Sequence, residues 1–365
     1  MASSAASTGF ESSDHSLFSI QELIKKPLLS VPQQYVRVDQ QPSTFFDKSS
    51  SPTIPTIDMK ALFMEETRDF ELEKLHLTCK EWGIFQLVNH GVSSPLLEKL
   101  REEIEAFFKL PLEEKMKYRV RPGDVEGYGN IVKTSEQKLD WGDRVFMIAN
   151  PISRRKPYLI PELPSSLRST LESYFMNLEK LATTLFGLLA KALEVEKREM
   201  DETFEDGMRG IRMTYYPPCP QPELVIGISP HSDVSGLTIL NQLNGVDGLQ
   251  VKKDGLWIPV HVLPDAFLVN VGDILEIMSN GVYKSAEHKV TVNNNKERIS
   301  VAMFFNPKYE ADIKPLASLI SPQNPPLFKN IRTEKYVEDF FSRRKLDGKS
   351  FLDHMKIKTG ENNTN

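Results

Sequence analysis

The chain has 365 residues, of which 40% are hydrophobic and 26% are charged, so it can build a sizeable core. Its net charge of −5 gives no basic excess. We therefore expect neither nucleic acid nor a membrane as a partner, and no obligate protein partner is evident. Two cysteines build no disulfide framework, and the first residues lack a signal-peptide pattern. These features predict a cytoplasmic globular protein.

The first half of the chain is predicted to be mainly helical. Residues 1–53 are rich in Ser, Pro and Gln and predict a flexible start with one short helix near 20–25. Residues 54–205 follow as a helical N-terminal region, in which hydrophobic spacing indicates the elements. Strands are expected at 54–59 and 84–88, helices at 68–82, 94–109 and 165–195, and a Gly- and charge-rich connection at 121–143.

The second half changes to short β-rich segments separated by turns, which predicts a sandwich or barrel over residues 206–310. The expected strands are 211–216, 225–233, 236–240, 248–252, 257–262, 266–271, 273–278, 283–292 and 298–305. The sequence KDG at 253–255 predicts a hairpin turn. Residues 311–365 form a C-terminal segment with helical patterning from 333 to 355.

Two histidines and one aspartate carry the most informative pattern. His231 and Asp233 are one residue apart, so on a strand their side chains point the same way. His288 follows Asp233 by 55 residues, in another predicted strand. Two imidazoles and one carboxylate leave coordination positions open, which suits non-haem Fe(II). His261 is the rival third ligand, although the prolines around it favour a strand end.

Arg298 and Ser300 come ten and twelve residues after His288 and are again separated by one. A guanidinium beside a hydroxyl on one strand face is a natural clamp for a carboxylate. Strand alternation places Phe304 on the same face as Ser300. Metal triad and clamp together are a far stronger indication of an active site than either half alone.

With these residues in view, the chain resembles the plant 2-oxoglutarate- and Fe(II)-dependent dioxygenases over residues 30 to 357. The family markers are IPTID at 54–58, EWGIFQLVNHG at 81–91, YYPPCPQP at 215–222, PHSD at 230–233 and RIS at 298–300. Within the family it resembles the senescence-related subgroup that includes the poppy thebaine and codeine O-demethylases. The subgroup markers are VPQQYVR at 31–37, QKLDW at 137–141, NVGDILEI at 270–277 and KLDGK at 345–349.

The resemblance implies an α+β fold, with a double-stranded β-helix (jelly-roll) core surrounded by α-helices. It implies that His231, Asp233 and His288 bind Fe(II), with O2 as the oxidant and ascorbate as the reductant. The cosubstrate 2-oxoglutarate is then held by four residues, namely Arg298, Ser300, Tyr216 and Thr214. The substrate pocket is expected to include Arg212, Ser235, Phe304 and Asn306.

Four departures from the family pattern concern the pocket more than the chemistry. Thr214 stands where the family usually has Asn, Lys289 where it has Arg, and His261 where Lys is common. The connection at 130–140 is one residue shorter than in close relatives. None of these positions belongs to the predicted triad or to Arg298 and Ser300.

The expected function is oxidation of a small plant specialised metabolite, such as an alkaloid, phenylpropanoid or terpenoid, with release of succinate and CO2. Hydroxylation, O- or N-demethylation and desaturation share one metal site, and the placement of the substrate carbon decides between them. One alternative is an oxidase of the same fold that does not use 2-oxoglutarate, against which Arg298 and Ser300 argue. Another is a non-catalytic barrel that binds a metabolite or hormone, against which the intact triad argues.

Overall fold

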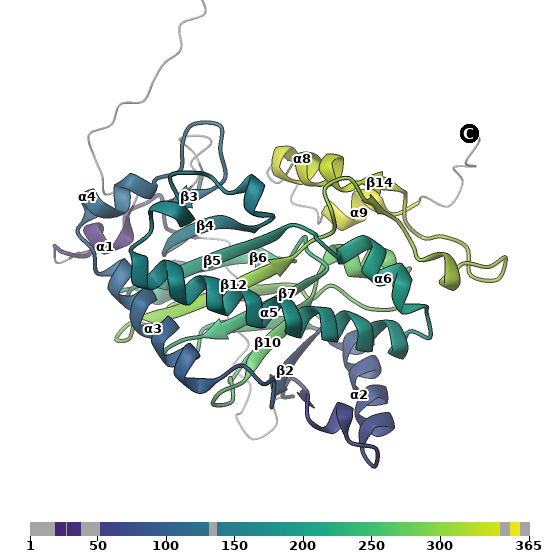
Figure 1. Ribbon diagram of the computed structural model, residues 1–365. Coiled ribbons are helices and arrows are strands. Elements are labelled where there is room, and N and C mark those ends of the chain that lie inside the picture. The colour runs from purple at the N-terminus through teal and green to yellow at the C-terminus, as the bar shows by residue number, and fades with distance from the viewer. Residues whose placement is uncertain (1–18, 27, 38–51, 131–136, 344–350, 358–365) are drawn as a thin grey trace, which may run out of the picture.

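A computed structural model describes residues 19–26, 28–37, 52–130, 137–343 and 351–357. Two β-sheets form its centre (Figure 1), with the strand orders β1-β2-β10-β7-β12-β5-β4-β3 and β6-β11-β8-β9. The strands are β1 Thr56–Asp58, β2 Ile84–Val88, β3 Gly127–Tyr128, β4 Asp143–Asn150, β5 Arg209–Tyr216, β6 Ile228–His231, β7 Leu237–Gln242, β8 Leu249–Lys253, β9 Leu256–Pro259, β10 Phe267–Val271, β11 His288–Val290 and β12 Arg298–Phe305. Residues from both sheets line one cavity, so the sheets face each other. This arrangement confirms the predicted jelly-roll core.

Helices surround the two sheets, which confirms the α+β class. They are α1 Ile20–Leu23, α2 Arg68–Glu81, α3 Ser94–Phe108, α4 Leu112–Lys115, α5 Ser165–Ala192, α6 Lys197–Phe204, α7 Asp273–Met278, α8 Thr333–Arg343 and α9 Phe351–Met355. A small hairpin of β13 Asp312–Ile313 and β14 Ile331–Arg332 precedes α8. No helix in the described part of the chain is long and apolar enough to cross a membrane.

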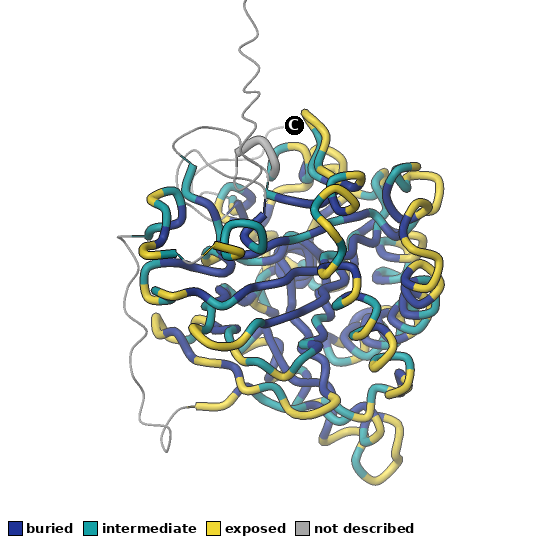
Figure 2. Tube along the Cα trace, turned by 90° about the vertical axis from the view of Figure 1, so that its left-hand side faces the viewer, coloured by how far each residue is buried: buried dark blue, intermediate teal, exposed yellow. Residues whose placement is uncertain are grey.

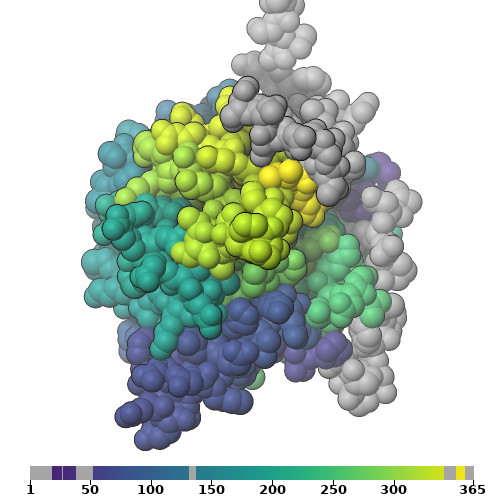
Figure 3. All heavy atoms as spheres, turned by 90° about the vertical axis from the view of Figure 1, so that its right-hand side faces the viewer, coloured from purple at the N-terminus to yellow at the C-terminus, as the bar shows by residue number. Residues whose placement is uncertain are grey.

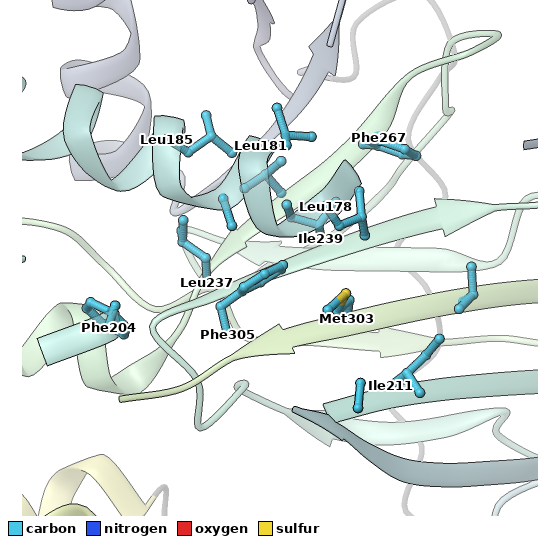
Figure 4. Packing of buried hydrophobic residues seen from close by; sticks show 14 of the residues in the cluster. Leu178, Leu181, Leu185, Phe204, Ile211, Leu237, Ile239, Phe267, Met303 and Phe305 are labelled. Carbon is cyan, nitrogen blue, oxygen red and sulfur yellow. The ribbon is translucent and has the colours of Figure 1, made fainter. Parts of the chain in front are cut away.

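The central strands of the larger sheet have two different faces because successive side chains alternate. Odd-numbered residues of β5, β7 and β12, such as Ile211, Ile239 and Met303, are fully buried beneath α5. Figure 4 shows Leu178, Leu181 and Leu185 of α5 packed over them. Even-numbered residues of the same strands face the smaller sheet, and the cavity lies on this side.

Burial follows this layering through the molecule. The strands run through the buried centre, and the exposed residues gather in the outer turns and helix surfaces (Figure 2). The C-terminal segment, coloured yellow-green, covers one end of the molecule (Figure 3). There Phe351, Leu352 and Met355 of α9 are buried in the main hydrophobic core. The predicted KLDGK motif at 345–349 lies outside the described residues.

The N-terminal helix α1 is fixed to the outer strand β4 by one carboxylate. Asp143 is fully buried and accepts hydrogen bonds from Ser19 Oγ and the Ile20 amide, both at 2.6 Å. Tyr128 donates a third from its hydroxyl at 2.9 Å. Burial raises the pKa of the Asp143 carboxyl above its ordinary value, although these hydrogen bonds and the nearby Lys115 act in the opposite direction. This short helix lies near the predicted position 20–25, whereas residues 1–18 lie outside the described part.

Several elements differ from the prediction. Residues 273–278, predicted as a strand, form the helix α7, in which all six residues are buried. A short apolar run without polar alternation fits a buried helix as well as a buried strand. The strand β4 at 143–150 was not predicted, nor were the short helices α4 and α6. The predicted strand 283–292 is reduced to β11, whereas β12 has the predicted bounds.

Candidate active site

Three potential metal ligands meet between the two sheets. His231 ends β6, His288 begins β11, and the two residues are direct partners in the antiparallel pairing of these strands. Asp233 follows two residues after His231, and its Oδ1 lies 3.7 Å from His231 Nε2 and 3.8 Å from His288 Nε2. All three ligand atoms lie within 4.8 Å of one another. The structure therefore brings together the predicted triad, in a geometry that could hold one metal ion.

Backbone carbonyls orient both imidazole rings. His231 Nδ1 lies 2.8 Å from the Ser229 carbonyl oxygen, and His288 Nδ1 lies 2.9 Å from that of Ala286. A carbonyl only accepts hydrogen bonds, so Nδ1 carries the proton in each ring. The Nε2 atoms then face Asp233 and are the ring atoms available to bind a metal, as in other histidine metal sites.

The carboxylate of Asp233 is buried but well supported. Burial by itself raises its pKa, yet His288, His231 and hydrogen bonds from Thr238 and Asn270 outweigh that effect and hold the pKa below its ordinary value. Asn270 Nδ2 lies 3.4 Å from Asp233 Oδ2. The carboxylate is therefore ionised at neutral pH, which is the form that binds a metal.

Arg298 provides a buried cation in the same region. It is 1% exposed, its Nη1 lies 3.2 Å from Ser300 Oγ, and its Nε and Nη2 each lie 3.3 Å from Gln242 Oε1. Its guanidinium carbon lies 5.2 Å from the centroid of the Tyr216 ring. Burial lowers the pKa of this guanidinium, with Tyr216 acting in the opposite direction, but an arginine remains protonated at neutral pH.

No carboxylate in the described part of the chain forms an ion pair with Arg298. An unpaired buried charge is costly, so the site has the chemistry of a binding site for an anion. Gly248 leaves room for this side chain, because a Cβ there would lie 3.0 Å from Arg298 Cδ. Tyr216 is likewise held between Gly142 and Gly227, where added Cβ atoms would approach its ring to 3.1 and 2.9 Å.

The triad lines one cavity together with Tyr216 and Ser300, the two residues that contact the guanidinium of Arg298. The lining residues that the sequence had singled out are Thr214, Tyr216, Ser300, Arg212 and Phe304. Strand pairing explains the grouping, because Thr214 lies opposite Ser300. In the same pairing Arg212 lies opposite Ala302.

Two predicted pocket residues are not brought to this cavity. Ser235 is buried with its hydroxyl 2.9 Å from Thr238 Oγ1, and it does not line the cavity. Asn306 lies just beyond β12, where its carbonyl oxygen accepts a hydrogen bond from Arg209 Nη1. Both residues lie just outside a strand, where the alternation of side chains no longer determines their direction.

Other cavity residues were missed by the sequence reasoning. They are Ile228, Thr238, Leu240, Leu249, Asn270, Val290 and Ala302. A signal existed for Ala302, because it shares strand parity with the predicted inward residues Ser300 and Phe304. Asn270 also had one, since it is a lone polar residue within an apolar strand.

The rival ligand and one family departure lie elsewhere. The side chain of His261 is 66% exposed and its Nδ1 lies 2.7 Å from Asp247 Oδ2, so it is not part of the triad. Lys289 places its ammonium 4.5 Å from the centroid of the Trp257 ring. Burial lowers the pKa of Lys289. His90 accepts a hydrogen bond from the Val92 amide and contacts the Asp265 carbonyl oxygen, so it holds a turn and is not a metal ligand.

An open two-histidine, one-carboxylate site inside a jelly roll defines a non-haem iron oxygenase by its chemistry. Comparison with known proteins agrees. The family profile of the 2OG-Fe(II) oxygenase superfamily matches residues 209–307, and that of the non-haem dioxygenase N-terminal region in morphine synthesis matches residues 54–164. The chain belongs to the 2OG-Fe(II) oxygenase superfamily, whose members are oxidoreductases.

Two plant relatives cover nearly the whole chain. Oxoglutarate-dependent flavonoid 7-O-demethylase 1 of Ocimum basilicum is 51% identical over 93% of this chain and 90% of its own length. Codeine O-demethylase of Papaver somniferum is 49% identical over 94% of this chain and 96% of its own. The crystal structure of JOX2 in complex with 2OG, Fe, and JA superimposes with a TM-score of 0.82 at 36% identity, covering 93% of this chain and 98% of that one.

Proposed function

We propose that this protein is a 2-oxoglutarate-dependent O-demethylase, which removes a methyl group from a small methoxylated plant metabolite and releases succinate and CO2. The observation that carries the proposal is that the triad and the neighbours of a buried cation line one cavity. The triad offers an open metal site, and Ser300 and Tyr216 in the same lining contact Arg298, whose buried charge no carboxylate among the described residues pairs.

The residues present fit Fe(II), because two imidazoles and one carboxylate leave open positions for other ligands. His231, Asp233 and His288 would hold the ion. When bound, iron supplies the activation of O2 that no protein side chain can provide. Asn270 and the two backbone carbonyls would keep the three ligands oriented.

Arg298 would bind the distal carboxylate of 2-oxoglutarate. A guanidinium pairs with a carboxylate through two hydrogen bonds, and the Ser300 hydroxyl beside it adds a third. Tyr216 lies against the guanidinium and offers its phenol, whereas Thr214 lies across from Ser300 on the neighbouring strand. These four residues would fix the cosubstrate and exclude water from its charged end.

The substrate would occupy the apolar end of the cavity near Leu240, Ala302 and Phe304. Arg212 is available there as a donor for a substrate oxygen, because its buried Nε has no hydrogen-bond partner among the described residues. Insertion of one oxygen atom into a methoxy C–H bond gives a hemiacetal, which collapses to formaldehyde and a free hydroxyl group. The other oxygen atom of O2 enters succinate. Two relatives named as O-demethylases support this outcome over other oxidations.

The test is a reaction of the purified protein with Fe(II), 2-oxoglutarate, O2 and a panel of methyl ethers. We expect succinate, formaldehyde and demethylated product in equal amounts. An oxidase that does not use 2-oxoglutarate would form product without succinate, and a binding protein would form neither. If a hydroxylated product formed without formaldehyde, the protein would be an oxygenase but the proposal of a demethylase would be wrong.

We infer further that ascorbate serves as the reductant of the iron and that the protein acts in the cytosol. The two cysteines support the location, because both are buried free thiols, as a reducing compartment allows. Omitting ascorbate should shorten the period of linear turnover without changing the initial products.

A further inference from the structure

Gly210 is the second residue of β5, and the backbone conformation at this position does not require a glycine. Its φ lies outside the left-handed region, so an alanine could adopt the same conformation. A side chain at position 210 would instead lack space. A Cβ at this position would lie 2.8 Å from Cε2 and 2.9 Å from Cζ of Phe146. A glycine inside a strand often marks the close approach of another group, and here that group is an aromatic ring.

The Phe146 ring reaches this place from the neighbouring strand. Phe146 of β4 is paired with Arg212, yet its ring leans along the strands and lies over Gly210. There it meets Phe304 of β12 at a centroid distance of 6.2 Å and an interplanar angle of 68°. We call Phe146 and Phe304 the aromatic corner. It spans β5, which lies between their two strands, and only a position without a side chain allows this.

The aromatic corner includes one of the partly exposed residues of the cavity lining. Both β12 and β5 are fully described strands. Phe304 is the one residue of β12 that is not buried, and Arg212 is the one such residue of β5. Phe146 is also partly exposed. Phe304 lines the cavity that also contains the triad, so a substrate bound there would lie beside the aromatic corner. A merely structural pair would be expected on the buried, odd-numbered side of the sheet beneath α5.

We propose that Gly210 is a specificity-determining residue. By leaving space for the Phe146 ring, it allows the aromatic corner to bind a flat aromatic ring that carries the methoxy group. Two phenylalanine rings at a large angle give one face for stacking and one edge or face for a perpendicular contact, and a planar ring satisfies both. A saturated, non-planar ring system can make neither the stacked nor the perpendicular contact. This inference rests on the proposed demethylase function and narrows its substrate class to aromatic methyl ethers.

The test compares Gly210→Ala, Phe146→Leu and the double variant. The added methyl should displace only the far end of the Phe146 ring, so the fold is retained. We expect kcat/KM for a flat aromatic methyl ether to fall roughly three- to tenfold relative to that for a saturated methyl ether, the range of one aromatic contact. Gly210→Ala should add nothing in the Phe146→Leu background, because both changes remove the same ring contact.

Gly187→Ala is the matched control, since Gly187 lies on α5 and an added Cβ there meets only the flexible end of Lys197. It should leave the substrate ratio unchanged. Dissociation constants of the same two ethers, measured by calorimetry without O2, give a second readout. If the wild type demethylates neither ether, the demethylase proposal fails, while the binding ratio still tests Gly210. Equal ratios in wild type and Gly210→Ala, in both turnover and binding, would overturn the role of Gly210.

Discussion

At the scale of single residues, metal binding and anion binding each depend on a few side chains. The triad is held by one strand pair and one loop residue, and within the described part of the chain no other group of His, Cys, Asp or Glu could hold a metal. The anion site likewise depends on Arg298 alone for its charge. Substitutions at these positions should therefore affect one step of the chemistry at a time.

Replacing His231, Asp233 or His288 by alanine should abolish succinate formation and weaken Fe(II) binding severely, because one of three ligands is lost. Far-ultraviolet circular dichroism should show a retained fold. His261→Ala is the control and should keep activity, since that side chain is exposed and paired with Asp247. Near-normal succinate formation in any triad variant would remove that residue from the metal site.

Arg298→Lys should raise the KM for 2-oxoglutarate strongly, because a point-charge ammonium cannot reproduce bidentate pairing. Ser300→Ala should act in the same direction by about 1 kcal/mol, the contribution of one hydrogen bond. Initial-rate kinetics with each substrate varied in turn separate the effects. A change confined to the KM of the methyl ether would contradict the assignment of Arg298 to the cosubstrate.

At the scale of elements, the packing of α5 and the pairing of β12 determine where these residues lie. The bounds of β12 and the amphipathic α5 were predictable, since each follows a single clear period of hydrophobic residues. The pairs His231/Asp233 and Arg298/Ser300 were predictable from their spacing of two residues, whereas His288 was joined to them by the resemblance to the family. By contrast, the contacts of Asn270 with Asp233 and of Gln242 with Arg298 depend on the register between strands, which one sequence does not contain.

The helix α7 shows a second reason why the sequence did not predict part of the fold. Its six residues were predicted as a strand, but its backbone begins at Gly272 with the Asp273 amide bonded to the Asp233 carbonyl oxygen at 2.7 Å. A Cβ at position 272 would lie 2.0 Å from the Ser235 carbonyl oxygen. Tertiary contacts at the metal-ligand loop therefore decide the conformation, and local propensity does not.

Leu185→Ala should lower the free energy of unfolding by roughly 2–5 kcal/mol, as for other buried leucines. Leu185 is fully buried on the face of α5 that packs on the sheet. Because α5 lies on the opposite side of the sheet from the cavity, the KM values should change little. Urea unfolding and kinetics at a temperature where the variant is folded would check both, and a selective loss of 2-oxoglutarate affinity would refute the separation of the two faces.

The stability contributed by the hydrogen bonds between α1 and Asp143 of β4 should depend on pH. The pKa of Asp143 is raised in the folded state above its ordinary value of 3.8, so the folded protein holds this proton more tightly than the unfolded chain does. This contribution to stability is therefore fully present below about pH 4 and is lost as the pH rises through the raised pKa.

The expected outcome is that Asp143→Asn gains stability over the wild type as the pH rises from about 4 to neutrality. Asp143→Ala should be less stable than either, since Ser19, Ile20 and Tyr128 lose their acceptor. Urea unfolding across this pH range measures the differences. Asp254→Asn, at an exposed carboxylate, is the control. If the stability difference between the wild type and Asp143→Asn did not change with pH, the linkage would be disproved.

At the scale of the whole molecule, ligands that fill the cavity should stabilise the fold by mass action. Binding to the folded state alone adds about 2.7 kcal/mol at a concentration roughly one hundred times the dissociation constant. We expect 2-oxoglutarate with a divalent metal to raise the Tm of the wild type, and a chelator to reverse this. Arg298→Lys should show a smaller increase, whereas an equal increase would place the anion elsewhere.

The division of the central sheet into an odd-numbered face under α5 and an even-numbered face on the cavity has a consequence for the gene. Every second codon of β5, β7 and β12 encodes structural packing, and the codons between them encode the cavity side of the sheet, where cosubstrate and substrate would bind. A mutational library confined to positions 210, 212, 240, 302 and 304 would therefore vary chemistry against a constant scaffold. New substrate ranges could accumulate in such a lineage without passing through unfolded intermediates.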